Sequence, residues 1–378
     1  MAKFKYVVSL SLTSLLIGCS NSTSSMLPDN TPSPTPDITL TSTATPKPTP
    51  TPLPSSPPKL TLSTTQTLDS PSFDPATPVG THGALTVDGI HIKDSNNEVF
   101  QLRGVSTHGI QWFKEYTCTE TFKGLRDNFK INAIRLALYA DDESMYPENQ
   151  DTYTKILEDA ISNATSLGLY VIVDWHILAD GNPMTNEDDA NTFFKYFSTK
   201  YQNYPNIIFE ICNEPNGSEA NWDDAIKPYA DKIISTIRTN SPTSIVIVGT
   251  PKWCQSPLSV VRNKITDPNV VYSFHFYADS HGYPLRQTLE SAINKYQLPM
   301  LISEFGTCSS SGDGNVNTVS CDEWLECIDS YSMGWFIWNL SDKNESSSLL
   351  VPDAPVCDWD DSDLTQSGLY IKERLLNY

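Results

Sequence analysis

Short, wholly apolar runs and longer amphipathic stretches alternate along the chain downstream of Ala84. The run Tyr170–Asp174 reads Tyr-Val-Ile-Val-Asp, without the polar alternation of a strand that has one face in water. Such runs are typical of parallel strands that are covered on both faces. Eight segments are predicted as strands on this pattern: Gln101–Val105, Ala133–Leu138, Tyr170–Trp175, Ile207–Cys212, Ser244–Val248, Val270–His275, Pro299–Ser303 and Gly334–Trp338.

Helical patterns lie between these strands, for example at Tyr153–Leu167 and Ser218–Asn240, and another follows at Leu364–Leu376. Eight strands that alternate with helices predict an α/β fold, the (β/α)8 or TIM barrel. The alternative is an open doubly wound sheet, but no glycine-rich phosphate loop follows any strand. Short alternating segments from Ala84 to Val105, with a turn signal at Asp88–Gly89, predict a hairpin that closes the bottom of the barrel.

The N-terminus has the pattern of an export signal. A basic start is followed by an apolar run from Tyr6 to Ile17, which is too short to span a bilayer. The run ends in Leu16–Cys19, a sequence similar to a bacterial lipoprotein box. We therefore expect residues 1–18 to be a lipoprotein signal peptide and the protein to be exported, anchored to a membrane through a lipid on Cys19. The alternative is an ordinary signal peptide and a secreted protein.

Residues 19–80 are rich in Pro, Thr and Ser and poor in charge, and they hold about half of the 27 prolines. Proline lacks the N–H that helices and strands need, so this stretch is predicted to be a disordered, extended linker. The remaining residues, 81–378, suit one catalytic barrel domain.

The composition excludes some classes of partner. The chain has 25 Lys and Arg against 45 Asp and Glu, for a formal net charge of −20, and no basic stripe. Nucleic acid is therefore not expected as a partner. Seven of the eight cysteines remain besides Cys19, and Cys308 and Cys321, which flank a Gly/Ser-rich loop, are predicted to form a disulfide.

Polar and aromatic residues gather at the carboxyl ends of the predicted strands, where barrels of this class hold their active sites. A buried core has no use for so many polar groups, because each costs free energy if it is unpaired. Two glutamates stand out, Glu214 after the fourth strand and Glu304 after the seventh, since two carboxylates are the equipment for glycosidic bond cleavage. The other candidates at these ends are His108, Trp112, Arg135, Tyr139, His176, Asn213, Trp253, His275, Tyr277, Trp338, Lys343 and Glu345.

At this point the chain resembles a known family. Asn213–Pro215 (Asn-Glu-Pro) and Ser303–Gly306 (Ser-Glu-Phe-Gly) are similar to the motifs of glycoside hydrolase family 5, a group of retaining (β/α)8 glycanases. Ser106–Trp112 and Trp338–Ser347 are similar to its bacterial endo-β-1,4-glucanase (cellulase) branch. The likeness runs from about residue 83 to about residue 370.

The resemblance implies a role for each candidate. Glu214 matches the acid/base and Glu304 the nucleophile. Arg135 and Asn213 match the arginine beside the nucleophile and the residue that binds the sugar 2-hydroxyl, while His275 and Tyr277 match the residues that orient the acid/base and the nucleophile. The expected substrate-binding residues are His108, Trp112, Tyr139, His176, Trp253, Trp338, Lys343 and Glu345.

Several neighbouring residues have a structural interpretation instead. Trp175 and Cys212 are predicted to pack in the core, and Glu210 is predicted to form a buried ion pair with Arg103. Cys254 and the acidic loop 141–146 depart from what the family pattern leads us to expect.

The substrate and class of activity have alternatives. A β-mannanase or xyloglucanase would use the same catalytic pair, and a non-catalytic carbohydrate-binding surface protein would not use it. A metal-dependent barrel hydrolase is disfavoured because neither His-x-His nor His-Glu-x-x-His occurs at the strand ends, so neither a metal nor another cofactor is expected. The expected partner is a β-glucan polysaccharide, bound by a monomer.

Overall fold

The computed structural model describes residues 59–62, 65–140, 146 and 149–378. The predicted signal peptide, Cys19, most of the predicted linker and most of the acidic loop lie outside the described residues. Everything below concerns the described residues of the unit Pro54–Tyr378. Within the described part, no helix is long and apolar enough to cross a membrane.

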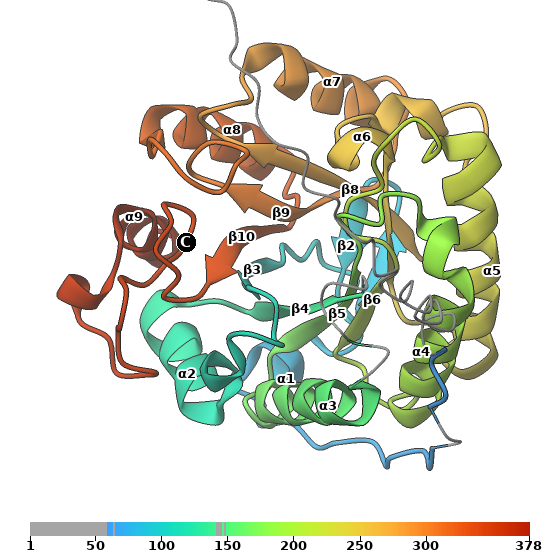
Figure 1. Ribbon diagram of the computed structural model, residues 1–378, viewed down its shortest axis with the longest axis horizontal. Coiled ribbons are helices and arrows are strands. Elements are labelled where there is room, and N and C mark those ends of the chain that lie inside the picture. The colour runs from blue at the N-terminus through green and yellow to red at the C-terminus, as the bar shows by residue number, and fades with distance from the viewer. Residues whose placement is uncertain (1–58, 63–64, 141–145, 147–148) are drawn as a thin grey trace, which may run out of the picture. The chain divides into compact units, whose positions relative to one another are not determined.

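Eight parallel strands close into a barrel in the order β10-β3-β4-β5-β6-β7-β8-β9 (Figure 1). The (β/α)8 prediction is therefore confirmed, and each strand lies within three residues of its predicted bounds. The strands are β3 (Arg103–Thr107), β4 (Ala133–Tyr139), β5 (Tyr170–His176), β6 (Ile207–Glu210), β7 (Val246–Gly249), β8 (Val270–Tyr277), β9 (Met300–Gly306) and β10 (Trp335–Leu340).

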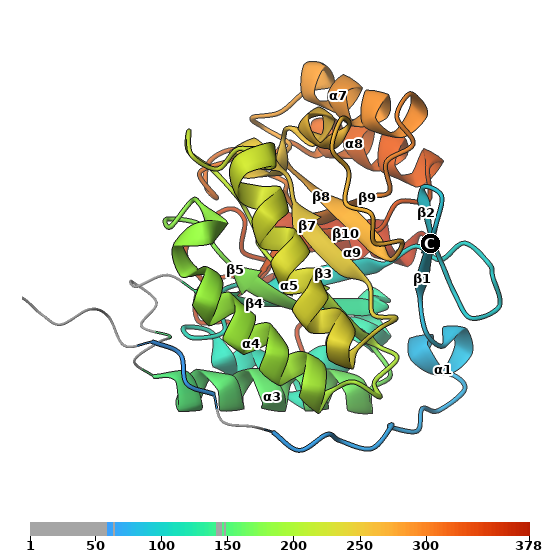
Figure 2. The same ribbon diagram turned by 90° about the vertical axis from the view of Figure 1, so that its right-hand side faces the viewer.

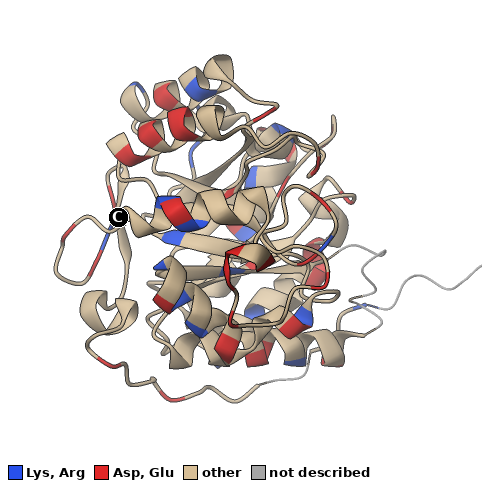
Figure 3. Cartoon of the chain, turned by 90° about the vertical axis from the view of Figure 1, so that its left-hand side faces the viewer, with Lys and Arg blue, Asp and Glu red and all other residues tan. Residues whose placement is uncertain are grey.

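Helices surround the strands (Figures 1 and 2). They are α1 (Pro78–His82), α2 (Thr119–Gly124), α3 (Gln150–Ser166), α4 (Glu187–Lys200), α5 (Lys227–Asn240), α6 (Pro251–Cys254), α7 (Tyr283–Asn294), α8 (Thr318–Ser330) and α9 (Gln366–Leu376). The segment predicted as one helix from Ser218 begins later. Asn221 caps a π-helical turn, Trp222–Ile226, which continues directly into α5. On the face in Figure 3, acidic and basic residues are interspersed along the helices.

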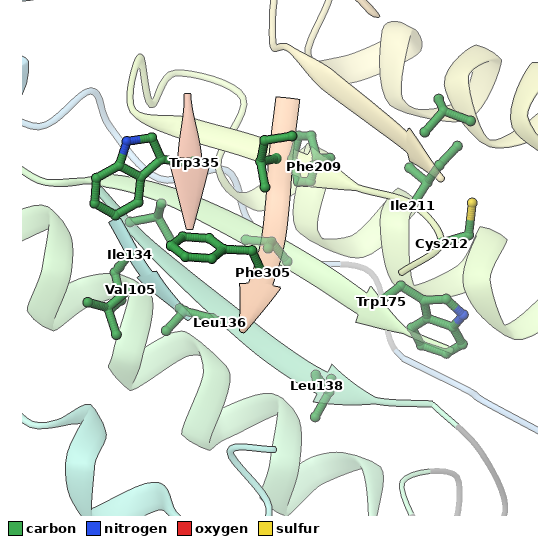
Figure 4. Close-up of a cluster of buried hydrophobic side chains, with 14 of the residues drawn as sticks. Val105, Ile134, Leu136, Leu138, Trp175, Phe209, Ile211, Cys212, Phe305 and Trp335 are labelled. Atoms are coloured by element: carbon green, nitrogen blue, oxygen red, sulfur yellow. The ribbon is translucent and has the colours of Figure 1, made fainter. Parts of the chain in front are cut away.

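Side chains alternate between the two sides of the barrel wall, because successive residues of a strand point to opposite faces. On β4, Ile134, Leu136 and Leu138 belong to the large core between strands and helices, part of which is drawn in Figure 4. Arg135 and Tyr139, on the same strand, therefore point inward. Trp175 and Cys212 are buried in the outer core, so their predicted packing role is confirmed.

A second, smaller core fills the amino-terminal end of the barrel interior, with Leu102, Ile208 and Leu301 among its members. It continues into the antiparallel hairpin of β1 (Thr86–Asp88) and β2 (His91–Lys93) through Ile92. The hairpin thus lies where the sequence predicted it, at the end of the barrel opposite the strand ends that carry the candidate residues.

Strand β9 contains one extra residue relative to β8. Ser273 pairs with Leu301 whereas His275 pairs with Glu304, so two steps on β8 correspond to three on β9. Ile302 and Phe305 both lie in the outer core. The irregularity therefore turns two consecutive residues, Ser303 and Glu304, toward the interior, as a β-bulge does.

Part of the predicted linker contacts the barrel. Leu60 is buried, and its backbone N–H donates to Asp189 on α4 at 2.9 Å. Leu68 donates through its N–H to the Lys200 carbonyl at the end of the same helix, also at 2.9 Å. Contacts to the barrel thus begin upstream of the predicted boundary at residue 81.

Candidate active site

The candidate residues converge on one cavity of about 620 Å³ at the carboxyl ends of the strands. Eleven of the fourteen line it: His108, Tyr139, His176, Glu214, Trp253, His275, Tyr277, Glu304, Trp338, Lys343 and Glu345. Arg135 and Asn213 are buried and bonded to these residues, whereas Trp112 lies outside the lining, with its ring centre 4.9 Å from that of Tyr139.

Glu214 follows the end of β6 and contacts a histidine from β8. Its Oε1 lies 2.8 Å from Nδ1 of His275, which is fully buried. The side chain of Glu214 is itself only 11% exposed, so the carboxyl opens to the cavity through a small part of its surface. His275 and Glu214 are thus in direct contact, as the proposed orienting role of His275 requires.

Glu304 is held on both of its oxygens. The Tyr277 hydroxyl donates to Oε1 at 2.8 Å, and the Arg135 guanidinium donates to Oε2 at 3.3 Å. One oxygen of Glu304, one of Glu214 and a ring nitrogen of His275 all lie within 4.8 Å of one another. That separation is close to the roughly 5–5.5 Å between the carboxyls of retaining glycosidases, and well below the roughly 6.5–9.5 Å of inverting ones.

Arg135 joins the carboxylates below the cavity. Besides Glu304, its guanidinium contacts Glu210 at 2.7 Å and Asp174 at 2.9 Å, and it donates to the Asn213 side-chain oxygen at 2.7 Å. Glu210 therefore pairs with Arg135, and the prediction that it pairs with Arg103 is wrong. Arg103 instead packs its guanidinium over the ring of Tyr378, 4.2 Å from the ring centre.

Burial and nearby negative charges raise the pKa values of the two carboxyls, Glu214 and Glu304. Burial, together with the charges on Glu210 and Asp174, raises the pKa of Glu214 to about 7 against the opposing effect of Arg135. Burial and the charge on Glu214 raise the pKa of Glu304 to about 7, while His275, Arg135 and the Tyr277 hydrogen bond oppose the rise. Near neutral pH the pair therefore holds one proton. We assign the charge to Glu304, because Arg135 and Tyr277 both contact that carboxyl and favour its ionised form.

His176 is oriented from below by a carboxylate. Its Nδ1 lies 2.7 Å from Asp174, and its Nε2 lies 3.2 Å from the Asn213 side-chain nitrogen, which is a donor. The proton is thus on Nδ1. Burial lowers the pKa of His176 well below its usual value, so the ring is neutral.

The rim of the cavity carries aromatic and charged groups. Trp253 is 47% exposed, and positive φ angles at Lys252, Trp253 and Cys254 turn the α6 segment so that this indole faces solvent. Trp338 on β10 also lines the cavity and lies 5.2 Å from His176, ring centre to ring centre. Lys343 and Glu345 form an ion pair at 2.6 Å.

The cavity also contains residues that the sequence reasoning missed: Leu178, Gln255, His281, Ser310, Ser311 and Gly312. His281 and Gln255 follow strands closely enough for the strand-end rule to have included them. The Ser310–Gly312 segment has no residue type that signals a site. Asp174 and Glu210 were missed as partners of Arg135, although each is the one acidic residue of a mainly apolar strand.

The cysteines give a second correction. All seven cysteines of the described residues are free, so the predicted Cys308–Cys321 disulfide is wrong for this structure. Both thiols are buried, and the Cys308 Sγ contacts the carbonyl of Ser309. Cys254, which departs from the family pattern, donates from its Sγ to the Asn213 carbonyl at 3.0 Å and so supports the strand end that carries Glu214.

Comparison with known proteins agrees with this geometry. The family model described as cellulase (glycosyl hydrolase family 5) matches residues 93–344. Endoglucanase A of Evansella cellulosilytica is 41% identical over 276 residues, which are 73% of this chain and 56% of that protein. Endoglucanase N of Pectobacterium atrosepticum is 38% identical over 79% of this chain and 67% of its own length. The chain therefore spans between about half and two thirds of these relatives.

Solved structures show the same fold. The catalytic domain of Thermobifida fusca endoglucanase Cel5A, in a variant solved in complex with cellotetraose, superposes with a TM-score of 0.76 at 35% identity, covering 80% of this chain and 100% of that one. A structure named cellulase Cel5C_n superposes with a TM-score of 0.77 at 36% identity, covering 80% and 95%.

Proposed function

The chain belongs to glycosyl hydrolase family 5, and from that premise we propose that it is a retaining endo-β-1,4-glucanase that hydrolyses internal bonds of cellulose or mixed-linkage β-glucan. The observation that carries the proposal is the pair of buried carboxyls, Glu214 and Glu304, with oxygens within 4.8 Å of each other in the cavity at the strand ends. Support for the substrate comes from the relatives, which are named endoglucanases, and from the cellotetraose bound to the Thermobifida fusca relative.

The first half of the proposed reaction transfers the glycan to the enzyme. A carboxylate oxygen of Glu304 attacks the anomeric carbon, and the bond from that carbon to the glycosidic oxygen breaks. Glu214 gives its proton to the departing oxygen, so the leaving chain departs as a neutral alcohol. Arg135 and Tyr277 hold Glu304 in its ionised form and aim it, while Asn213 is placed to bond the sugar 2-hydroxyl, a contact that strengthens toward the transition state.

The second half releases the product. Water attacks the anomeric carbon from the face that the leaving chain vacated, and Glu214, now ionised, takes a proton from it. The ester to Glu304 breaks, and its carboxylate is restored. Two inversions at one carbon give net retention of the β configuration.

The remaining candidates are proposed to bind the polymer. The flat apolar face of a β-glucose matches an indole, so Trp112, Trp253 and Trp338 are proposed as platforms under sugar rings. Sugar hydroxyls are proposed to bond to His108, Tyr139, His176, Lys343 and Glu345. Each of these except Trp112 lines the cavity.

We extend the proposal to the ends of the chain on sequence grounds. Residues 1–18 would direct export and Cys19 would carry the lipid, residues 19–80 would be the spacer, and residues 81–378 would be the catalytic region of a monomer. Incorporation of labelled palmitate into the full chain but not into Cys19→Ala would support the anchor. Equal labelling of both would contradict it.

The activity is tested by viscosity and reducing-end assays of the full chain on carboxymethylcellulose, galactomannan and xyloglucan, with and without a chelator. A fast viscosity drop on carboxymethylcellulose alone, unchanged by the chelator, is the expected result. Preference for either other polymer would keep the mechanism and change the substrate. Loss of activity with the chelator would favour metal catalysis, and no hydrolysis of any polymer would favour a binding protein.

A further inference from the structure

A chain of four buried side chains runs behind the acid/base, from β6 through β9 and β8 to the cavity. The Ser303 hydroxyl donates to Oε1 of Glu210 at 2.6 Å, and Nε2 of His275 lies 2.9 Å from the same hydroxyl oxygen. On the far side of the ring, Nδ1 of His275 lies 2.8 Å from Oε1 of Glu214. Ser303 belongs to this series of hydrogen-bonded side chains because the extra residue in β9 turns it inward, next to Glu304.

The proton of Ser303 is committed to Glu210. Oε2 of Glu210 forms the ion pair with Arg135 at 2.7 Å. Its Oε1 lies 2.6 Å from the Ser303 oxygen, and two oxygens come that close only when a proton lies between them. The Ser303 oxygen must therefore accept its other hydrogen bonds. It has two neighbours, the Ser273 hydroxyl at 2.5 Å and Nε2 of His275, so both of these donate.

This assignment fixes the tautomer of His275. A neutral imidazole has one N–H and one lone pair, and burial, which lowers the pKa of His275 to about 4, keeps this ring neutral. With the proton on Nε2, Nδ1 can only accept. A hydrogen bond from Glu214 to Nδ1 then exists only when the Glu214 carboxyl is protonated.

We propose that Ser303 is a positioning residue that sets the tautomer of His275, and thereby keeps the acid/base Glu214 protonated until the leaving group takes its proton. A hydrogen bond made only by the neutral carboxyl disfavours ionisation. After the proton has left, the lone pair on Nδ1 faces the Glu214 carboxylate. This favours recovery of a proton from the attacking water in the second half of the reaction. The inference rests on the proposed function for its effect on rate, but the tautomer itself does not depend on it.

Other charged and titratable groups face His275 and Glu214 from every surrounding element, and the substitution of Ser303 leaves all of them in place. They are Arg135 and Tyr139 on β4, Asp174 and His176 on β5, Glu210 on β6, Cys254 on α6, Tyr277 on β8 and Glu304 on β9.

The tautomer is read directly from the ¹⁵N shifts of the imidazole in the full chain labelled at its six histidines, with His275→Asn to assign the signal. The expected wild-type pattern at neutral pH is a protonated Nε2 and an unprotonated Nδ1. Ser303→Ala removes the acceptor, so the proton is expected to move to Nδ1 and bond the Glu214 carboxylate. Ser303→Thr retains a hydroxyl and is expected to keep the wild-type pattern.

The consequence for catalysis is read from the pH dependence of kcat/KM with two aryl β-cellobiosides. In Ser303→Ala the basic limb is expected to move down by about one pH unit, which slows the phenyl substrate about fivefold at pH 7. The 2,4-dinitrophenyl substrate, whose leaving group needs no proton, is expected to lose little. Ser273→Ala is the matched control, since it removes a buried hydroxyl that touches Ser303 but not the histidine, and both its spectrum and its basic limb are expected to match wild type.

Several results would overturn the inference: a protonated Nδ1 in the wild type, an unchanged spectrum in Ser303→Ala, or equal rate losses on the two substrates. An effect of Ser273→Ala as large as that of Ser303→Ala would also overturn it. A wild-type protein with the expected spectrum that cleaves neither cellobioside would overturn the proposed function and leave the tautomer assignment standing.

Discussion

At the scale of single residues, two glutamates with the same side chain differ in their ionisation because different groups contact them. Glu304 is bonded by Arg135 and Tyr277, which favour its ionised form, whereas Glu214 faces the ring nitrogen of a neutral histidine. Environment rather than residue type thus assigns the proposed roles of nucleophile and acid/base.

The proposed nucleophile is tested by Glu304→Ala. This variant is expected to lose on the order of 10⁴-fold or more in kcat, because no carboxylate remains to attack. Sodium azide is small enough to enter the vacated space and should restore cleavage of the 2,4-dinitrophenyl substrate, giving the α-glycosyl azide, which NMR identifies. Glu345→Ala is a control on the same cavity and should show no azide rescue. Activity of Glu304→Ala equal to that of the wild type would end the assignment.

The pH dependence tests the proton shared by the pair. Since Glu304 acts ionised and Glu214 acts protonated, kcat/KM should be bell-shaped with its maximum near pH 7, and the two limbs belong to the pair as a whole. In Glu214→Gln the basic limb should disappear. The acidic limb should move to lower pH, because the charge that raises the pKa of Glu304 is gone.

The pH profile of kcat/KM for Glu214→Gln is measurable with the 2,4-dinitrophenyl substrate, because the leaving group of that substrate does not need a proton from Glu214. An acidic limb that stays in place in Glu214→Gln would contradict the electrostatic coupling of the two carboxyls.

At the scale of elements, the site depends on one arginine that links four strands of the barrel. From β4, Arg135 contacts Asp174 on β5, Glu210 on β6 and Glu304 on β9, and all four side chains are almost fully buried. One positive charge thus faces three carboxylates. Its removal leaves the carboxylates in a buried site with no cation.

Arg135→Met is therefore expected to lower the free energy of unfolding at pH 7 by about 3–5 kcal/mol. The loss should be smaller at pH 5, because the stranded carboxyls can take up protons there. Urea unfolding at the two pH values measures both effects, and exposed Arg262→Met should change stability by no more than about 0.5 kcal/mol. A loss below about 1 kcal/mol at pH 7 would show that the ion pairs do not hold these strands.

The elements also show how far the sequence leads. Apolar runs predicted the eight barrel strands, since burial on both faces leaves a plain record in residue type. The hairpin was predicted from its alternating pattern and its turn signal. The strand-end rule and the family resemblance brought together eleven residues that line one cavity. They did not decide which arginine meets Glu210. Arg103 shares its face of β3 with Val105 of the outer core and packs over Tyr378. Arg135 instead points into the barrel and reaches Glu210.

The extra residue in β9 was also beyond sequence reasoning. Strict alternation along Met300–Gly306 would send Ser303 and Glu304 to opposite faces, whereas the bulge sends both inward. The Cys308–Cys321 disulfide failed for a related reason, since closeness in sequence across a loop says nothing about the direction of two side chains.

At the scale of the whole molecule, ionisation of the buried Glu214 lowers the free energy of unfolding. Burial raises the folded-state pKa of Glu214 to about 7 from its usual value of 4.5, so the folded protein binds more protons here than the unfolded chain between those values. The stability that Glu214 contributes is thus present at low pH and is lost as the pH rises through 7.

Glu214→Gln does not ionise and should therefore gain stability relative to the wild type as the pH rises from 5 to 8, by about 2 kcal/mol. Parallel urea unfolding curves at several pH values measure the difference. Glu219→Gln, on the exposed surface, should track the wild type throughout. A constant difference between Glu214→Gln and wild type would contradict the raised pKa.

The stereochemistry of the product tests the central claim most directly, because the close pair of Glu214 and Glu304 predicts a double displacement. Cellotetraose would be cleaved by the full chain, and the anomeric protons of the new reducing ends followed by NMR from the first minute. The account predicts that the β-anomer appears first and that the α-anomer grows only at the rate of mutarotation. Initial formation of the α-anomer would mean a single displacement, and the assignment of Glu304 as nucleophile would be wrong.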